Sequence, residues 1–480
     1  MTVPLRSPTG RAVVLATVLG SSLAMLDATV VNIALPRIGE DLGATVAGLQ
    51  WVLSGYTLTL ASLILLAGAL GDRLGRRRVF VWGTVWFTVA SIGCALAPTI
   101  GVLVAARVLQ GVGAALLTPG SLALLSATID PDDHGTAIGL WSGLGGVASA
   151  AGPLVGGWLV EVASWRAVFW LNLPLAVAVV WVAVRHVPDS RDPNAHGRLD
   201  VPGTVLGIVA LAALTYGLIG GHPAPVVAGI ALFGVFVVVE RRSTDPLVPP
   251  SLFRSRVFTA ANLVTLTVYA ALGGVFFLLV LQLQIVAGYS PMASGLATLP
   301  ITVLMLALSA RAGRWAQHHG PRLPMTAGPV VGAAGLLLML RIGPGASYLT
   351  DVLPAVLVFG LGLSTLVAPL TGAVLNSVST DRAGIASGVN NAVARSAQLL
   401  AVAALPGLAG ITDYGDASAF SAGFRTAMLI CTGLMLAGAA LAFVMVPASK
   451  PAVPHDDSIE CRPHCDIAAP SIDPNRERSR

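Results

Sequence analysis

Charge is scarce in this sequence. Asp, Glu, Lys and Arg make up 11% of its 480 residues, whereas about 25% is usual in a soluble domain. Hydrophobic residues make up 55%, and the mean hydropathy is +0.81. A nucleic-acid-binding protein would need basic residues clustered on one soluble face. The composition argues against such a protein and predicts an integral membrane protein that crosses the bilayer many times.

Lysine is almost absent, and no long polar segment interrupts the apolar ones. Lys450 is the only lysine, and Ser449 rather than glycine precedes it, so the chain lacks the Gly-Lys phosphate loop of the Walker type. No segment is long enough to form a soluble domain with a nucleotide site or a catalytic triad. The sequence therefore indicates neither an ATP-driven pump nor an enzyme, and we expect no catalytic residues.

Cysteine is also rare, with four residues in the chain. Cys94 and Cys431 fall in apolar segments, and nothing suggests a disulfide framework. The polar end of the chain combines two cysteines with two histidines, His455, Cys461, His464 and Cys465. Their spacing matches no closed zinc pattern well, so we expect neither a metal site nor a cofactor.

Apolar segments of about 20 residues, the length needed to cross a bilayer, occur fourteen times. Glycine and proline inside them are typical of packed membrane helices, and a β-barrel would instead alternate every two residues. The sequence therefore predicts an all-α, polytopic membrane protein with fourteen transmembrane helices. These are expected at residues 12–36, 48–71, 79–98, 101–126, 134–160, 166–187, 200–221, 223–240, 257–287, 292–316, 323–342, 350–376, 384–411 and 420–446.

Two short similarities, each eight spans apart, suggest duplicated halves. Residues 71–78 resemble 313–322, and residues 132–135 resemble 381–384. Six helices, two inserted helices and six more would produce that offset, although chance similarity of glycine-rich loops is the alternative. The expected domains are a cytoplasmic N-terminal tail (1–11), a six-helix bundle (12–187), two inserted linker helices with their loops (188–256), a second six-helix bundle (257–446) and a disordered cytoplasmic tail (447–480).

The distribution of basic residues predicts the orientation, because cytoplasmic loops are enriched in Lys and Arg. With fourteen spans both termini share one side, and that side holds 22 of the 28 basic residues. The others are Arg37, Arg166, Arg341 and Arg425 on the other side, and Arg107 and Arg395 within spans. Both termini are therefore expected in the cytoplasm. The scarcity of lysine beside abundant Arg, Ala and Gly hints at a GC-rich bacterial genome and thus at an inner membrane.

Asp27 is a carboxylate inside the first span, where a charge costs about 3 kcal/mol or more. At 1.5 Å per residue it lies about 12 Å from the outer end of its span, and Arg107 lies about 9 Å from the outer end of the fourth. We therefore expect the two to meet, and movement of the arginine would change the protonation of the carboxylate. Thr29 and Asn32 are expected to add hydrogen-bonding groups beside Asp27. A static ion pair between two helices is the alternative.

The loop between spans 2 and 3 contains the most specific string in the chain. Residues 68–78 read Gly-Ala-Leu-Gly-Asp-Arg-Leu-Gly-Arg-Arg-Arg. Glycines permit a tight turn, and the acid with its arginines can form a cytoplasmic charge cluster. A loop that serves only to set topology would explain the arginines but not the glycine spacing or the acid. The candidate gate residues are Gly68, Gly71, Asp72, Arg73, Gly75 and Arg76.

Glycine is concentrated in the fifth span. The run Gly152, Pro153, Gly156 and Gly157 would give a smooth face and a kink for close packing in lipid. A passive packing surface and a moving one have the same sequence pattern.

These strings resemble motifs of the major facilitator superfamily, specifically its fourteen-span drug:proton antiporter branch. The resemblance covers residues 10–446. It rests on residues 26–36, the loop 68–78, Arg107 with Gln110, Gly111 and Gly113, the run 152–157, and the signature from Trp165 to Pro174. It implies a major facilitator fold of two six-helix bundles plus two inserted helices. It also implies that Asp27 and Arg107 couple protons, that Asp72 and its arginines form the cytoplasmic gate, and that span 5 slides at the domain interface.

The resemblance further implies a secondary antiporter that exports small amphipathic or drug-like molecules by alternating access. Its expected partners are a small-molecule substrate, protons and the lipid bilayer, with no nucleic acid, and we expect a monomer driven by the proton gradient. A metabolite or nutrient symporter on the same fold is the alternative, and the span 5 glycines argue against it.

One departure from the branch concerns the substrate. Some members carry a further acid in a span of the second half, but residues 292–315 contain none, which favours neutral, monocationic or amphipathic compounds over dications. Each candidate cavity residue could instead be an interhelical contact or an interface anchor. These candidates are Trp51, Tyr56, Trp141, Asn262, Tyr269, Phe276, Gln282, Gln284, Asn390, Asn391 and Arg395.

Overall fold

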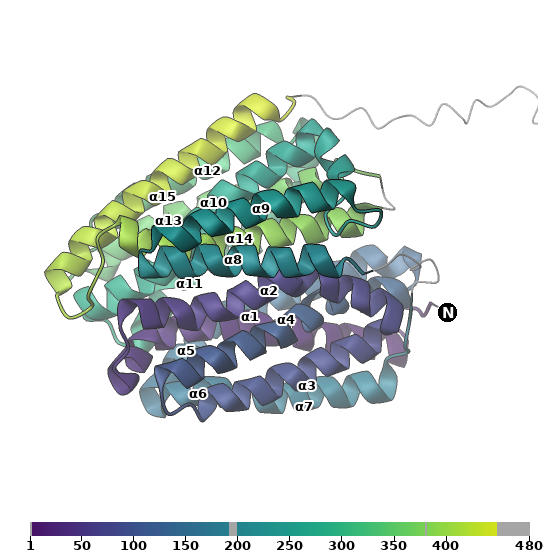
Figure 1. Ribbon diagram of the computed structural model, residues 1–480, viewed down its shortest axis with the longest axis horizontal. Helices are drawn as coiled ribbons and strands as arrows, with labels where there is room; N and C mark the ends of the chain where they lie inside the picture. Colours follow the sequence, from purple (N-terminus) through teal and green to yellow (C-terminus); the bar gives the residue numbers. More distant parts are fainter. Residues whose placement is uncertain (1, 192–198, 380–381, 449–480) are drawn as a thin grey trace, which may run out of the picture.

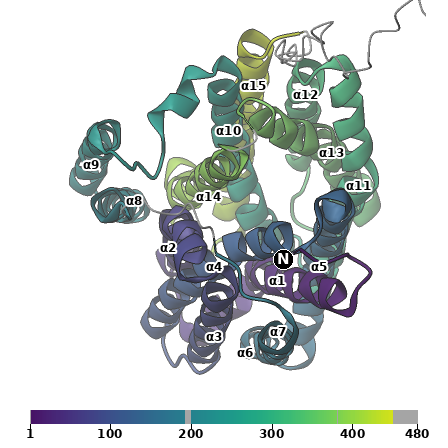
Figure 2. The ribbon, with the colours of Figure 1, turned by 90° about the vertical axis from the view of Figure 1, so that its right-hand side faces the viewer.

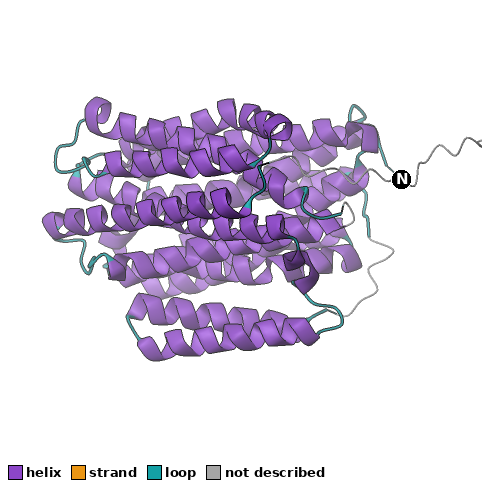
Figure 3. Ribbon diagram, turned by 90° about the horizontal axis from the view of Figure 1, so that it is seen from above, coloured by secondary structure: helices purple, strands orange, loops and turns teal. Residues whose placement is uncertain are grey.

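The computed structural model describes residues 2–191, 199–379 and 382–448. Within these ranges the chain is helical, and its β-type contact is a single bridge between Val3 and Ile129 (Figure 3). The first half of the chain lies below the second in Figure 1, with the helix axes running across the view.

Every predicted span corresponds to a helix. The helices are α1 (Pro8–Leu42), α2 (Val46–Leu74), α3 (Arg76–Ala95), α4 (Ile100–Thr128), η1 (Pro131–Asp133), α5 (His134–Val162), α6 (Trp165–Trp170), α7 (Asn172–His186), α8 (Val201–Gly220), α9 (Pro223–Arg242), η2 (Pro250–Arg254), α10 (Arg256–Leu281), η3 (Gln282–Val286), α11 (Pro291–His319), α12 (Arg322–Met339), η4 (Tyr348–Val352), α13 (Leu353–Leu375), α14 (Ala383–Leu408) and α15 (Ala417–Met445).

Thirteen helices of the described residues are long and apolar enough to cross a bilayer. The predicted span that is missing from this set is the thirteenth, 384–411; it corresponds to α14, which has 26 residues but carries Asn390, Asn391, Arg395 and Gln398. It packs against α10, α2 and α8. Protein therefore surrounds much of this helix, as expected where polar side chains lie at membrane depth.

The two halves repeat the same helix contacts. α1 packs against α5 and α7, while α10 packs against α14 and α15; α4 packs against α2 and α3, while α13 packs against α11 and α12. The loops after α2 and α11 also correspond, because Gly75 (φ 111°) and Gly320 (φ 89°) end these helices with the positive φ that glycine tolerates. The other similarity noted in the sequence includes residue 381, which lies outside the described residues.

Small residues bring neighbouring helices close together. A Cβ on Gly113 of α4 would stand 2.5 Å from the backbone nitrogen of Phe87 in α3, and a Cβ on Gly335 of α12 would stand 2.5 Å from that of Phe359 in α13. Such contacts are the usual way membrane helices gain packing energy, because lipid tails are as apolar as the side chains.

The helices α8 and α9 form a hairpin beside the two halves (Figure 2). α8 contacts α2 in the first half and α14 in the second. In the most apolar 18-residue stretch of α9, only 11% of the residues are buried. This hairpin accounts for the eight-span offset between the corresponding loops.

Because the fourteen long helical segments of the described residues alternate in direction, the start of α1 and the end of α15 lie at one end of the bundle. We call this end the terminal side and the other end the opposite side. The first residues bind the protein, although 1–11 were predicted as a tail: Val3 N donates to Thr128 O and Leu5 N donates to Asp133 Oδ2, both at 2.8 Å. The predicted tail 447–480, with its Cys and His residues, lies outside the described residues from 449 onward.

Acids neutralise most of the arginines on the opposite side. Arg37 Nη1 lies 2.8 Å from Glu40 Oε2, Arg166 Nη1 lies 2.6 Å from Asp41 Oδ2, and Arg341 Nη2 lies 3.6 Å from Asp351 Oδ1. These pairs are partly exposed and contribute little stability. They do, however, leave that side with less uncompensated positive charge than its arginines alone suggest.

Candidate functional site

Asp27 and Arg107 form a buried ion pair in the first half. Arg107 Nη1 on α4 donates to Asp27 Oδ2 on α1 at 2.5 Å, and the two residues are 0% and 2% exposed, respectively. The comparison of depths predicted this contact, and the structure shows it. A buried ion pair is stable only when its remaining polar atoms also find partners.

Two amide side chains bind the second carboxylate oxygen. Gln110 Nε2 and Asn172 Nδ2 donate to Asp27 Oδ1 at 2.9 and 3.1 Å. Gln110 Oε1 also accepts from Arg107 Nη1 at 2.6 Å. Asn172 Nδ2 donates as well to Ser91 Oγ on α3 at 3.0 Å. Helices α1, α3, α4 and α7 therefore all contribute to one hydrogen-bonded network around the carboxylate.

Arg107 connects this network to the boundary between the halves. Its Nε donates to Val52 O at 3.1 Å, and its guanidinium lies 4.3 Å from the centroid of the Tyr56 ring, both on α2. Such stacking is a favourable cation–π contact. Helix α2 in turn packs against α14 of the second half. A continuous chain of interactions thus links Asp27 to the second half.

Thr29 and Asn32 do not bind Asp27, contrary to prediction. The Thr29 hydroxyl donates to Met25 O and Leu26 O, and Asn32 Nδ2 donates to Ala28 O. At about 100° per residue, positions two and five residues along a helix point to its other side. Thr29 faces α5 instead, where a Cβ on Gly152 would stand 2.0 Å from its hydroxyl oxygen.

The glycine run of α5 faces two different neighbours. Gly152 and Gly156 pack against α1, and a Cβ on Gly156 would stand 2.6 Å from Val30 Cγ1. Gly157 packs against the second half, because its Cβ would stand 2.6 Å from Met292 Cα and 2.8 Å from Pro291 O at the start of α11. Pro153 O lies 2.4 Å from the point where a Cβ on Gly295 of α11 would stand. The run therefore lines both the core of the first half and the seam between the halves.

Hydrogen bonds between the halves gather on the opposite side. Gln50 Nε2 donates to Val402 O at 2.8 Å, and Gln284 Nε2 donates to Ile33 O at 3.1 Å. Glu161 Oε2 accepts from Ser290 Oγ at 3.1 Å. The Gln50 amide is 3% exposed, so these contacts include a buried one. The halves are fastened to each other at that end.

The loop between α2 and α3 binds the segment that leaves α7. Asp72 Oδ1 accepts from Arg76 Nε at 2.8 Å, as the predicted charge cluster requires. Arg76 N donates to Ser190 O at 2.9 Å, and Arg78 Nε lies 3.2 Å from Asp189 Oδ2. Both carboxylate oxygens of Asp189 lie 2.7 Å from where a Cβ on Gly75 would stand.

Glycine is therefore required at position 75 by both space and its positive φ. The glycines at 68 and 71 are less constrained. The nearest atom to a Cβ on Gly68 would be 3.9 Å away, and Gly71 has none within 4 Å. Arg73 also takes part in an interaction within the described residues.

The predicted cavity residues divide into three groups. Tyr56, Trp141 and Gln282 make contacts within their own halves: Tyr56 under Arg107, Trp141 to Ser21 Oγ, and Gln282 to Ile342 O. Gln284 instead joins the halves. The remaining residues lie in or beside the central helices α2, α10 and α14, and they are Trp51, Asn262, Tyr269, Phe276, Asn390, Asn391 and Arg395.

Within that last group, α10 and α14 are linked by polar contacts. Asn390 Nδ2 donates to Asn262 Oδ1 at 3.2 Å and to Thr265 Oγ1 at 2.8 Å. Helix α14, which carries Arg395, also packs against α2 of the first half. α14 therefore contacts helices of both halves.

Asn172 and Asp189 were not assigned roles from the sequence. Asn172 lies seven residues after Trp165, or about 10 Å along the sixth span, so the comparison of depths that paired Asp27 with Arg107 also applies to it. The sequence gives a weaker indication of a role for Asp189: it is an acid that comes directly after a span, on the same side of the membrane as the run of arginines at 76–78. Within the described residues no three His, Cys, Asp or Glu side chains form a group that could hold a metal ion.

Comparisons with known proteins match this architecture. A sequence profile described as the Major Facilitator Superfamily matches residues 17–402. The chain is 35% identical over 464 residues to the puromycin resistance protein of Streptomyces alboniger, which covers 92% of each chain. It is also 35% identical to the tetracenomycin C resistance and export protein of Streptomyces glaucescens, over 82% of this chain and 74% of that one.

Solved transporter structures share the fold. A D-xylose-proton symporter aligns with a TM-score of 0.67 at 15% identity, over 92% of this chain and 98% of its own. A POT family transporter aligns with a TM-score of 0.68 at 16% identity, over 90% and 97%. The profile match and the relatives above 30% identity go further than the fold: this chain is a multi-pass membrane transporter, not an enzyme, and it belongs to the Major Facilitator Superfamily.

Proposed function

We propose that the protein is a secondary antiporter that exports small amphipathic molecules in exchange for protons. The observation that carries this proposal is the buried Asp27–Arg107 pair, whose guanidinium stacks on Tyr56 beside the second half. Charged residues at such depth are expensive and mark ion or proton pathways. Relatives named for puromycin resistance and tetracenomycin C export support the direction of transport.

Proton binding at Asp27 would change the contacts of Arg107. While Asp27 is ionised, its charge and that of Arg107 compensate each other. When a proton neutralises the carboxylate, the guanidinium is left buried with an uncompensated charge, which is unfavourable. Arg107 then gains by moving, and the Tyr56 ring that it covers moves with it. This sequence couples proton binding to the boundary where α2, which carries Tyr56, packs against α14, which carries Arg395.

The arrangement of the halves supports an inward-facing state. Their hydrogen bonds through Gln50, Gln284 and Glu161 lie on the opposite side. We propose that both termini lie in the cytoplasm of a bacterium, with the chain in its inner membrane as a monomer. The closed side then faces outward. No cofactor is needed, because the proton gradient supplies the energy.

The substrate is proposed to be neutral or singly charged. α11 carries no acid to bind a second positive charge, and the polar groups at the boundary are amides, tyrosines and Arg395. Apolar sites with a few polar groups are typical for drug-sized molecules. The methylenomycin A resistance protein of Streptomyces coelicolor, 36% identical over 84% of this chain, also supports a small organic substrate.

Efflux in inverted membrane vesicles tests the proposal. Asp27→Asn should abolish uptake driven by a pH gradient while counterflow between two substrate pools continues, because only the proton-coupled step needs the carboxylate. Asp132→Asn, at an exposed acid on the terminal side, is the matched control. Gradient-driven transport that survives in Asp27→Asn would refute the role of Asp27. Protons that move in the same direction as the substrate would instead indicate the symporter.

A further inference from the structure

Two acids outside the Asp27 network face each other at the terminal side of the α8–α9 hairpin. Asp200 directly precedes α8, and Glu240 lies in the last turn of α9; they are 9% and 4% exposed. Asp200 Oδ2 and Glu240 Oε1 lie 2.7 and 2.4 Å from the point where a Cβ on Gly203 would stand. The absence of a side chain at Gly203 thus leaves room for the two carboxyl groups to approach.

The other oxygen of each acid has a defined structural task. Asp200 Oδ1 accepts from Gly203 N at 2.8 Å and so caps α8. Glu240 Oε2 accepts from Val248 N at 2.9 Å and so holds the segment that leads to α10. Both acids are therefore fixed in place by backbone hydrogen bonds. Neither can turn away from the other without losing one of these bonds.

The facing oxygens have no hydrogen-bond donor among the described residues. Ionised carboxylates are acceptors only, and two buried like charges close to each other repel strongly. One proton would resolve both problems, because it turns one acid into a donor and leaves the other as its acceptor. The site therefore lacks one hydrogen atom that its chemistry requires.

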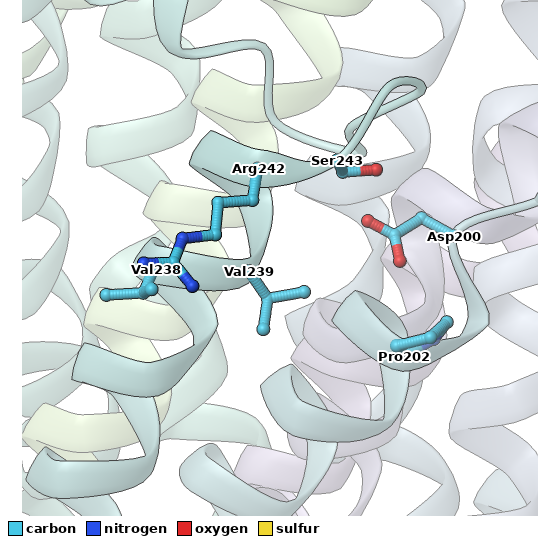
Figure 4. Close-up of a pocket in the computed structure, with 6 residues that line it drawn as sticks. All are labelled: Asp200, Pro202, Val238, Val239, Arg242 and Ser243. Atoms are coloured by element: carbon cyan, nitrogen blue, oxygen red, sulfur yellow. The ribbon is translucent and has the colours of Figure 1, made fainter.

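Nearby basic side chains do not replace that hydrogen. Arg242 lines a cavity of about 290 Å³ together with Asp200, and Figure 4 shows its side chain extending toward Val238, away from the Asp200 carboxylate. The ion pairs of the described residues include neither Asp200 nor Glu240. Arg241 is exposed, and Asp245 in the following loop would add negative charge.

We propose that Asp200 and Glu240 bind one proton between their facing oxygens at neutral pH. This shared proton holds the start of α8 against the end of α9. Through Val248 it also fastens the segment that enters the second half. The site is distinct from Asp27 and stands independently of the transport function proposed above.

Infrared spectroscopy of the purified full-length protein in lipid nanodiscs tests this inference. The wild type should show the carbonyl stretch of one protonated carboxyl group that is absent from both Asp200→Asn and Glu240→Gln. Asp132→Asn, which changes an exposed acid, should leave that signal unchanged. Asp200→Asn keeps the helix cap, and its amide donates to Glu240 in place of the proton, so its Tm should stay within a few degrees of wild type.

Gly203→Ala gives a second test that retains both acids. Its methyl group would come within 2.7 Å of both facing oxygens and push them apart, so the shared hydrogen bond should be lost and the protonated-carboxyl band should move from its wild-type frequency. An unchanged signal in both Asp200→Asn and Glu240→Gln would overturn the proposal. A second result would also overturn it. If sodium chloride in place of choline chloride raises the Tm of the wild type but not that of Glu240→Gln, a metal cation rather than a proton occupies the site.

Discussion

Gly157→Ala should shift the protein away from the arrangement in which the halves are fastened on the opposite side. The new Cβ would lie 2.6 Å from Met292 Cα and 2.8 Å from Pro291 O, both backbone atoms that cannot rotate aside. Carbon atoms in contact prefer about 3.5–4.0 Å, so α5 and α11 must separate by roughly 1 Å. Overpacking of this kind costs about 1–3 kcal/mol, and that energy changes a conformational equilibrium by about 5- to 150-fold.

Spin labels across the opposite side would measure that change. Leu96 in the first half and Leu349 in the second are 65% and 70% exposed, so labelled cysteines there should not disturb packing. Cys461 and Cys465 would be replaced by serine, whereas Cys94 and Cys431 are buried, and buried structural cysteines are inert toward labelling reagents. The labels should give a short distance when the halves are fastened and a long one when they are apart. We expect the ratio of the long-distance population to the short-distance population to rise at least about fivefold, the lower end of the range above.

Two glycines of the same helix serve as controls. No atom lies within 4 Å of the point where a Cβ on Gly143 would stand, so Gly143→Ala should behave as wild type. Gly156 packs on Val30 within the first half, so Gly156→Ala should lower Tm without changing the label distances. The reasoning is refuted if Gly157→Ala gives the wild-type distances, or if Gly156→Ala shifts them equally.

Three further substitutions test other contacts. Asn172→Ala removes a donor to Asp27 Oδ1, and a hydrogen bond to a charged group is worth about 1.5–3 kcal/mol. Proton-driven efflux should therefore fall at least about tenfold, while Asn172→Gln retains part of it. Wild-type activity in Asn172→Ala would contradict the role of the network. Gly75→Ala places a side chain where φ is 111° and makes it clash with Asp189. The free energy of unfolding should fall by about 1–3 kcal/mol, which lowers Tm, whereas Gly71→Ala should have little effect. The hydrogen bond from the Ser418 hydroxyl is the main reason why the pKa of Asp416 lies below its usual value, and the backbone N–H groups of Ala419 and Ser418 add to it. The stability that Asp416 adds is therefore present at neutral pH and lost as pH falls through that lowered pKa, and the acid limb of a Tm-against-pH curve should flatten in Asp416→Asn.

The periodicity of apolar residues was sufficient to predict the helices and one central contact. Asp27 and Arg107 could be paired from the sequence because depth in a membrane is counted along each helix, and the count is the same for every span. The same count did not reveal which side of α1 each residue faces. Thr29 and Asn32 were therefore wrongly placed beside Asp27, although the 3.6-residue period already excludes it.

Contacts that depend on a backbone carbonyl group or on how a helix ends could not be predicted. Gln50 binds the carbonyl oxygens of Val402 and Ala403, and carbonyl groups carry no sequence signal. The pairing of Asp200 with Glu240 depends on how two short helices end and on the space left by Gly203. The sequence shows that Glu240 lies at the end of a span. It does not show that the neighbouring helix buries this residue, because burial is a property of the folded chain.

The arginine–carboxylate pairs on the opposite side have a consequence for a departing solute. Arg37, Arg166 and Arg341 each lie within 4 Å of an acid, and at the ionic strength of a cell such dipoles are screened beyond about 8 Å. If this side faces outward, as proposed above, an organic cation on its way out would meet an almost neutral rim rather than a ring of positive charge. Replacing the three acids by amides would restore that ring, and the penalty on release should then increase with the charge of the compound and decrease with added salt.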